Sequence, residues 1–215
     1  LSSSSAASDV YKRQALKQGL PNLEKHLENV KQFNIVPVIA INRFVSDSDA
    51  EIAAVREFAV NNNVKVALAE VWAKGGKGAL DLAQHVIDIV ESGESNFTPL
   101  YDWEDDVKSK IETIATKIYG AESVEYSAMA RKNLRTIADL GLEKLPICMA
   151  KTQKSLSDDP KLIGRPTGFT ITIREIEIAA GANFLIPITG AMMRMPGLPG
   201  HPASENISID NDGNI

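Results

Sequence analysis

Two short apolar runs separated by a helical pattern restrict the fold of this chain most strongly. The runs are IVPVIAI at 35–41 and VKVALAEV at 64–71, and both are rich in branched residues. Runs of this length and composition are typical of strands that are buried on both faces of a sheet. Because helical patterns lie before, between and after them, residues 22–92 are predicted to fold as α-β-α-β-α. The predicted fold class is therefore α/β, with a parallel sheet and right-handed crossover helices.

Apolar spacing and polar residues at the helix starts indicate the helices of this segment. Leu23, Leu27 and Val30 lie three or four positions apart, which predicts a helix that Asn22 can cap. A capping box is predicted at the start of the next helix, from Ser48 and Glu51. The apolar sides of that helix and of the helix after the second run consist of Ile52, Val55 and Ala59, and of Ala79, Leu82, Ala83, Val86, Ile87 and Val90.

Two loops are expected at the same edge of the predicted sheet. NRFVSDSD at 42–49 and WAKGGKG at 72–78 each follow the end of a predicted strand. In open parallel sheets, ligands bind outside the carboxyl ends of the strands. Phe44 and Trp72 lie in these loops, and an aromatic side chain at such an edge packs either on the protein or on a ligand. We expect the two rings to face each other across a gap that fits a flat ring, with a separation on the order of 7 Å when a ligand is bound.

The glycines and lysines of the second loop allow two interpretations. Lys74 and Lys77 among three glycines could contact a phosphate, or the glycines could permit a tight turn into the following helix. A P-loop requires a hydroxyl residue after its lysine, and here Gly78 and Ala79 follow Lys77. The P-loop motif occurs nowhere in the chain. Arg43, Lys74 and Lys77 remain as candidate contacts for an anion.

Composition excludes several classes of protein. The net charge of −5 gives no support to nucleic-acid binding, and no apolar run is long enough for a membrane span. The single cysteine, Cys148, lies in an apolar run and is interpreted as inert core, and we expect a reducing, cytoplasmic location. The histidines have no second histidine or cysteine at metal spacing, so no metal site is expected.

The first fourteen residues differ from the rest of the chain. LSSSSAASDVYKRQ is rich in Ser and Ala and lacks periodicity. It is either a disordered tail or, the interpretation we favour, translated adapter or primer sequence joined to a truncated gene, with the chain proper starting near Ala15. The predicted organisation is this leader at 1–14, an α/β segment at 15–95 and a smaller α/β unit at 96–215.

The second unit is predicted from apolar runs and glycine stops. A helix containing Val107 and Ile118 should end at Gly120, and a further helix at Gly141. LPICMA at 145–150 is predicted as a buried strand, and 169–180 and 184–189 as strands. The long loop between them carries Lys151, Lys154 and Arg165, and it is either a solvated charged loop or a functional one.

Six stretches together resemble formate–tetrahydrofolate ligase. They are VIAINRF, EVWAKGGKGA, IATKIYGA, PICMAKTQKSLSDDP, RPTGF and RMPGLPG, in the order of that family. The resemblance, from about Ala15 onward, implies a partial P-loop-NTPase-like fold and a homo-oligomer. It also implies an activity that uses ATP with Mg²⁺, formate and tetrahydrofolate, through formyl phosphate. Because the family's P-loop lies in an N-terminal part, the chain resembles the C-terminal portion, and we expect it to be inactive alone and to lack the catalytic residues.

The resemblance also assigns roles to the aromatic residues. It implies that Phe44 and Trp72 hold the folate ring between them and that Leu68 lines the same pocket. The family often has proline where this chain has Val45, which can still supply apolar surface. Two hypotheses therefore remain, the folate side of an ATP-dependent ligase and a non-catalytic α/β module that binds a flat small ligand or a partner chain.

Overall fold

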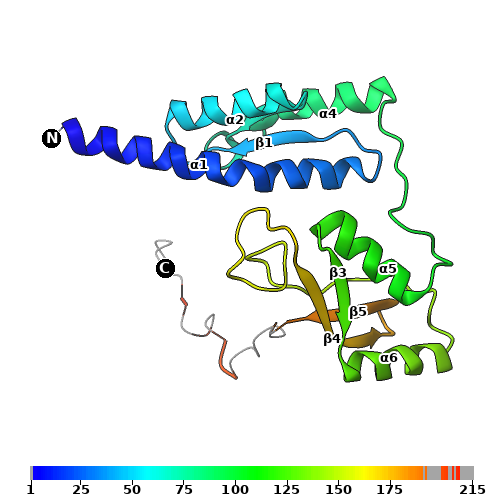
Figure 1. Cartoon of the computed structure of the whole chain (residues 1–215). Helices are drawn as coiled ribbons and strands as arrows, with labels where there is room; N and C mark the ends of the chain where they lie inside the picture. Colours follow the sequence, from blue (N-terminus) through cyan, green and yellow to red (C-terminus); the bar gives the residue numbers. More distant parts are fainter. Residues whose placement is uncertain (1, 191, 193–199, 203–204, 206, 209–215) are drawn as a thin grey trace.

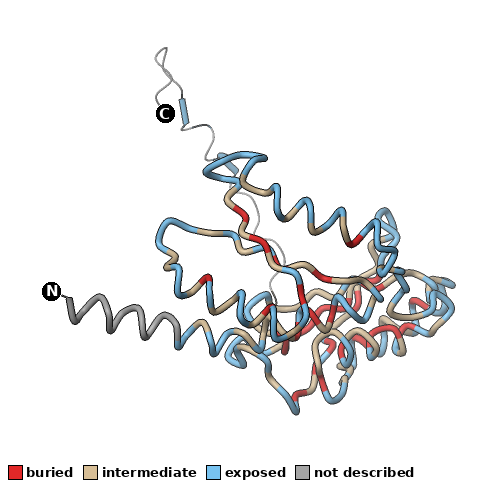
Figure 2. Tube along the Cα trace, turned by 90° about the horizontal axis from the view of Figure 1, so that it is seen from above, coloured by how far each residue is buried: buried red, intermediate tan, exposed pale blue. Residues whose placement is uncertain are grey.

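The computed structural model of the chain contains two α/β units joined by a linker (Figure 1). It describes residues 2–190, 192, 200–202, 205, 207 and 208, with the backbone alone for 2–13. The predicted α/β class is confirmed. Buried residues follow the strands and the helix faces beside them (Figure 2). No helix in the described part of the chain has both the length and the apolarity needed to cross a bilayer.

The first unit contains a two-stranded parallel sheet. Strand β1 (Val38–Asn42) pairs with β2 (Lys65–Ala69) in a register that runs from Val38↔Lys65 to Asn42↔Ala69. Helix α2 (Asp49–Asn61) connects the two strands, as predicted. Around the sheet lie α1 (Ser2–Lys31), α3 (Val71–Lys74), the 3₁₀ turn η1 (Gly75–Ala79) and α4 (Leu80–Ser92).

Of the two predicted helix starts, the one at Ser48 is confirmed and the one at Asn22 is wrong. The Ser48 hydroxyl accepts from the Glu51 backbone N–H at 3.3 Å, and the Glu51 carboxylate accepts from the Ser48 N–H at 2.9 Å, which completes the capping box. Asn22, by contrast, does not cap α1, because the helix begins at Ser2 and continues through Pro21. The preceding QALKQ consists of strong helix formers, which favour continuing the helix despite the proline. Residues 2–14 are thus helical, and their origin as foreign sequence remains a prediction.

Helix α4 does not bury its whole apolar side. Ile89 is the buried residue that faces the sheet, whereas Val86, Ile87 and Val90 are exposed at 47%, 47% and 71%. Ile89 is not one of the residues grouped on the predicted apolar side, and of that group Val86, Ile87 and Val90 lie exposed. In the described part of the chain this sheet has two strands, so α4 has more apolar surface than the sheet covers.

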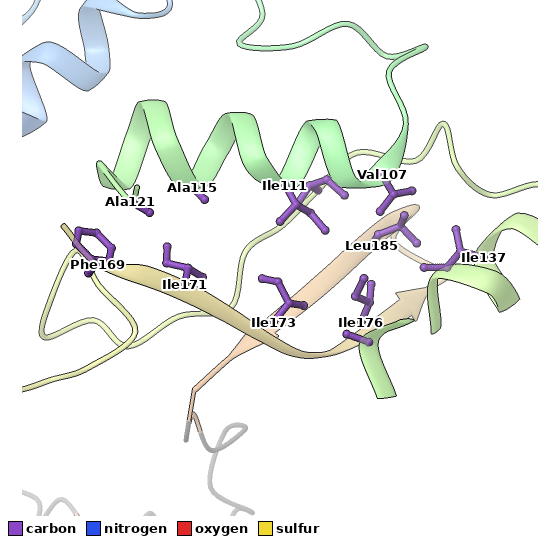
Figure 3. Close-up of a cluster of buried hydrophobic side chains, with 12 residues drawn as sticks. Val107, Ile111, Ala115, Ala121, Ile137, Phe169, Ile171, Ile173, Ile176 and Leu185 are labelled. Carbon is purple, nitrogen blue, oxygen red and sulfur yellow. The ribbon is translucent and has the colours of Figure 1, made fainter. Parts of the chain in front are cut away.

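The second unit packs a helix against a three-stranded sheet. Strand β3 (Ser123–Tyr126) is parallel to β4 (Thr170–Ala179), which is antiparallel to β5 (Phe184–Thr189). Helix α5 (Val107–Thr113) continues as a π-helical turn, η2 (Ile114–Tyr119), and stops at Gly120, whose φ is +79°. Helix α6 (Ala128–Asp139) ends before Gly141, as predicted. The core joins α5 to β4 and β5 (Figure 3).

A bulge in β4 decides which of its residues enter this core. Ile171 and Ile173 are two positions apart and both point to α5, as alternation requires (Figure 3). Ile176 is also buried, although strict alternation would direct it to the other face. The register shift between Ile173 and Glu175 changes the alternation and returns Ile176 to the core.

The predicted strand 145–150 forms an extended segment beside β5. Ile147 and Ala150 form isolated parallel bridges with Leu185 and Ile188. Ile147 is buried, but Cys148 is exposed, so the interpretation of Cys148 as inert core is wrong. The segment covers the core with one side only, and alternation turns the cysteine outward.

The linker after α4 contacts both units. The Asn96 and Thr98 N–H groups donate to the carbonyls of Asn34 and Phe33 at 2.9 and 3.0 Å, beside the end of α1. Further along, the Tyr101 hydroxyl accepts from the Ile147 N–H at 3.1 Å. Separate apolar clusters lie on the two sides of the linker, and the proposed boundary at 95/96 remains a prediction.

Candidate functional site

The carboxyl ends of β1 and β2 place the two predicted loops side by side. The strands end opposite each other at Asn42 and Ala69, and the Arg43 N–H donates to the Ala69 carbonyl at 3.2 Å. The chain therefore leaves both strands at the same edge of the sheet. This confirms the prediction that residues 42–49 and 72–78 lie together where α/β proteins bind ligands.

A hydrogen bond from Trp72 ties the second loop to the first. Trp72 lies in α3, and its indole N–H donates to the Arg43 carbonyl at 2.8 Å. On the other loop, the Phe44 N–H donates to the Asp47 carboxylate at 2.8 Å, which fixes the turn after β1. Each aromatic residue is thus held by its own hydrogen bond next to the same strand ends.

The predicted ring-binding residues have different exposures. Phe44 and Trp72 are 59% and 63% exposed, and Val45 is 87% exposed. Leu68 is half-buried within β2, opposite Ile41 of β1. Because both aromatic side chains are already exposed, a ligand can cover their rings without first drawing them out of the core. The facing arrangement of Phe44 and Trp72 across a gap remains a prediction.

The cations of the site are paired with carboxylates of the same loops. Arg43 lies 3.2 Å from Asp49 and 4.0 Å from Glu70. Lys74 forms an ion pair with Glu70 one helical turn away, and this hydrogen bond holds the pKa of Glu70 below its usual range. An anionic ligand group would therefore compete with Glu70 and Asp49 for these cations. Such exposed pairs exchange partners at little cost.

Glu70 is a site residue that the sequence analysis did not identify. Two signals were available, its position directly after β2 and its spacing of four residues from Lys74. Lys77, the third candidate cation, is exposed on η1. The three candidate cations thus lie along one edge, with Glu70 between the first two.

Two glycines give the second loop its shape. Gly75 has φ +56° and ψ −147°, a backbone conformation that favours glycine. Gly78 has no side chain, and a Cβ at this position would lie 2.4 Å from the Glu70 carbonyl oxygen, too close for any other residue. The Glu70 N–H donates to the Gly78 carbonyl at 3.0 Å, so the loop returns to the end of β2. These contacts favour the turn interpretation of the glycines over a phosphate cradle.

Other candidate chemistry is absent from the residues with described positions. Within them, no group of three or more His, Cys, Asp or Glu side chains is placed to hold a metal ion. Two hollows lie away from the sheet edge. One is apolar, about 380 Å³, and is lined by Phe33, Tyr101 and Trp103 among others. The other, about 450 Å³, lies between α1 and the loop after residue 150.

The sequence was also compared with models of known protein families. The model of formate–tetrahydrofolate ligase matches residues 3–215, nearly the whole chain. The match begins within the segment interpreted as a leader and includes both loops of the sheet edge.

Proposed function

Because the chain belongs to the formate–tetrahydrofolate ligase family, we propose that the edge of its parallel sheet binds the fused ring of tetrahydrofolate. Phe44 and Trp72 stack on opposite faces of that ring. The observation that carries the proposal is the tie from the Trp72 indole N–H to the Arg43 carbonyl, which holds two exposed aromatic residues next to the same strand ends.

Each side chain of the edge has a distinct part in this binding. Stacking fixes the plane of the folate ring, and Leu68 and Val45 supply apolar surface around it. Arg43, Lys74 and Lys77 offer positive charge to the carboxylates of the folate, in exchange for Glu70 and Asp49. Holding the fused ring in one plane restricts the positions that the N10 nitrogen, attached through a methylene group, can reach, which lowers the entropic barrier to reaction.

The chemical step of such a ligase joins formate to N10. A formate oxygen attacks the terminal phosphorus of ATP, which releases ADP and gives formyl phosphate. The N10 nitrogen then attacks the formyl carbon, phosphate leaves, and N10 loses its proton. The residues of this chain bind and orient the acceptor in that second step.

The residues present do not fit the ATP-Mg²⁺ side of the reaction. The glycine loop has no hydroxyl residue after Lys77, and Gly78 packs on the Glu70 backbone. These residues are therefore not expected to hold the terminal phosphate of ATP during its transfer. We expect the purified chain, given ATP, formate and tetrahydrofolate, to form no 10-formyltetrahydrofolate. Product in excess of a no-enzyme control would overturn this expectation.

Calorimetric titration with reduced tetrahydrofolate tests the binding proposal. Loss of one stacking face costs about 1–3 kcal/mol by analogy with bases stacked on aromatic side chains, which is roughly fivefold to 150-fold in Kd. We expect Phe44→Ala and Trp72→Ala each to raise the Kd by this factor. Phe97→Ala is the matched control, since Phe97 is 62% exposed but lies in the linker. Equal effects of Phe44→Ala and Phe97→Ala would exclude the sheet edge as the folate site.

The same substitution separates binding from catalysis in a longer enzyme that carries an ATP site. There, Trp72→Ala should raise the KM for tetrahydrofolate by roughly tenfold and leave the KM values for ATP and formate nearly unchanged. An unchanged folate KM in a correctly folded variant would contradict the stacking role.

A further inference from the structure

A hollow of about 450 Å³ lies between α1 and the long loop that follows residue 150. Its wall on α1 includes Asn22 and His26, and its wall on the loop includes Lys151, Gln153 and Lys154. Among the described residues, no carboxylate lines it. The hollow lies in the second unit's loop and on α1, outside the sheet edge proposed for folate.

Lys151 organises the loop around its ammonium group. The ammonium donates to the carbonyls of Thr152 at 2.9 Å and Ser157 at 3.1 Å, and also to the carbonyl of Ser155. It also lies over the Tyr119 ring, 4.9 Å from the centroid. The loop is therefore wrapped around a fixed positive charge, and burial lowers the pKa of Lys151.

The carboxylates near the hollow are directed elsewhere. Asp158, which partly counteracts the lowered pKa of Lys151, accepts from the Thr172 N–H of β4 at 2.9 Å. Glu24 and Glu28 of α1 bind the Arg165 guanidinium at 3.1 and 2.7 Å. Each of these three acids thus has a partner outside the hollow, and the charge of Lys151 is left without a directly bonded carboxylate.

Lys154 supplies a second and more accessible charge. It is exposed, and in the described part of the chain no carboxylate lies within ion-pair distance of its ammonium group. Asn22, Gln153 and His26 add neutral or basic groups that donate hydrogen bonds. Two lysines and several donors around a hollow without a lining carboxylate form an environment complementary to clustered negative oxygens.

We propose that this hollow binds a small anion that carries two or more negative charges on neighbouring oxygens. Lys151 and Lys154 provide the charge, and Asn22, His26 and Gln153 provide hydrogen bonds. The recognised chemistry is shared by phosphate esters and polycarboxylates, so pyrophosphate and citrate serve as probes of the two sources. The proposal goes beyond the folate site and does not rest on it.

The test is calorimetric titration of the full chain with each probe at constant ionic strength. We expect saturable binding of at least one probe at one site per chain. Binding of pyrophosphate alone assigns a phosphate ligand, binding of citrate alone assigns a polycarboxylate, and binding of both assigns recognition by charge density. Absence of saturable binding by either probe overturns the proposal.

A pair of lysines from the same loop distinguishes the hollow from general surface charge. Lys154→Ala should weaken binding of the probe by about fivefold or more, the effect of losing a charged hydrogen-bonding partner. Lys161→Ala removes an equal charge from an exposed residue of the same loop that does not line the hollow, and it should change the Kd by less than about twofold. Equal losses in the two variants would show attraction to net charge only and would overturn the site.

Discussion

The two units of the molecule differ in how far each closes its own core. Among the described residues, the buried cluster of the second unit contains twelve residues, whereas that of the first contains Leu27, Ile39, Ala59 and Val64. The second unit places a helix across one face of a mixed sheet, and the buried residues of β4 and β5 face that helix. The first has a parallel sheet of two strands and an exposed apolar side on α4.

This difference shows that a segment can form the helices and strands that its α/β pattern predicts and still not bury the apolar surface of those elements. Parallel sheets are normally covered on both faces, and a sheet of two strands offers little area to its helices. The candidate folate site nevertheless lies on the first unit, the one with the smaller core.

Truncation of a core isoleucine should have the largest effect. Ile173→Ala removes a fully buried side chain from the second unit and should lower its unfolding free energy by about 2–5 kcal/mol. Ile39→Ala in the first unit should cost less, because fewer buried neighbours surround it. Urea unfolding followed by tryptophan fluorescence tests this. Each alanine variant is measured in two backgrounds, Trp72→Phe, in which Trp103 is the reporter, and Trp103→Phe, in which Trp72 is the reporter. If both alanine variants shift both reporters equally, the units share one cooperative core.

The exposed side of α4 should mediate self-association. Leu80, Val86, Ile87 and Val90 form an apolar strip that we expect to pack against a second copy at micromolar concentration. Val90→Lys should weaken that association by roughly tenfold, the effect of about 1.5 kcal/mol of lost burial. Val60→Lys on α2 is the control, because Val60 is similarly exposed at 70%. Light scattering that finds only monomer for the unmodified chain would contradict this role of α4.

Arg165 should couple the two units weakly. Its guanidinium contacts Glu24 and Glu28 of α1 from the loop of the second unit. Arg165→Ala should lower the unfolding free energy by at most about 1 kcal/mol, and added salt should reduce the difference, because the pairs are partly exposed. Arg56→Ala, an exposed arginine of α2, is the matched control. A larger, salt-independent loss would mean that Arg165 contributes mainly through packing.

Substitution of Lys110 should have the smallest effect, a change in how the unfolding free energy depends on pH. Its ammonium donates to the carbonyls of Trp103 at 2.7 Å and Glu143 at 3.0 Å, and burial lowers its pKa from 10.5. Between the lowered pKa and 10.5 the unfolded chain binds more protons than the folded chain, so this lysine makes the unfolding free energy rise with pH. Relative to Lys110→Met, the unmodified chain should therefore gain stability as the pH rises toward 10.5.

Denaturant unfolding of both proteins at neutral and alkaline pH measures that difference. The other lysines with lowered pKa, Lys25 and Lys151, are present in both proteins and cancel in the comparison. A constant difference across the pH range would contradict the assignment to Lys110.

Much of the local structure could be predicted because it depends on short-range patterns. Strand β1 begins inside the run 35–41 and ends one residue beyond it, the run 64–71 contains β2, and Ser48 with Glu51 forms the capping box. Their pairing in parallel follows from the single helix between them. The shared position of Phe44 and Trp72 at one edge is a direct consequence of that topology.

The features that could not be predicted depend on which parts of the folded chain pack against each helix or strand. Strand β3 has only four residues, and its pairing with β4 bridges a long separation in sequence. The exposure of Val90 follows from the width of the sheet that α4 covers. Cys148 is exposed because its extended segment is covered on one side only. In each case the missing information is the tertiary neighbour.

The close approach of Gly78 to Glu70 also limits how the loop length could vary. The hydrogen bond between their backbones closes residues 70–78 into a loop, and Trp72 lies within that loop. An inserted residue would have to bulge out between Gly75 and Lys77, where the glycines have open space around them. An insertion between Glu70 and Trp72 would change the position of the indole relative to the Arg43 carbonyl to which it donates. The loop therefore has one tolerant stretch and one stretch whose length is set by the position of a single ring.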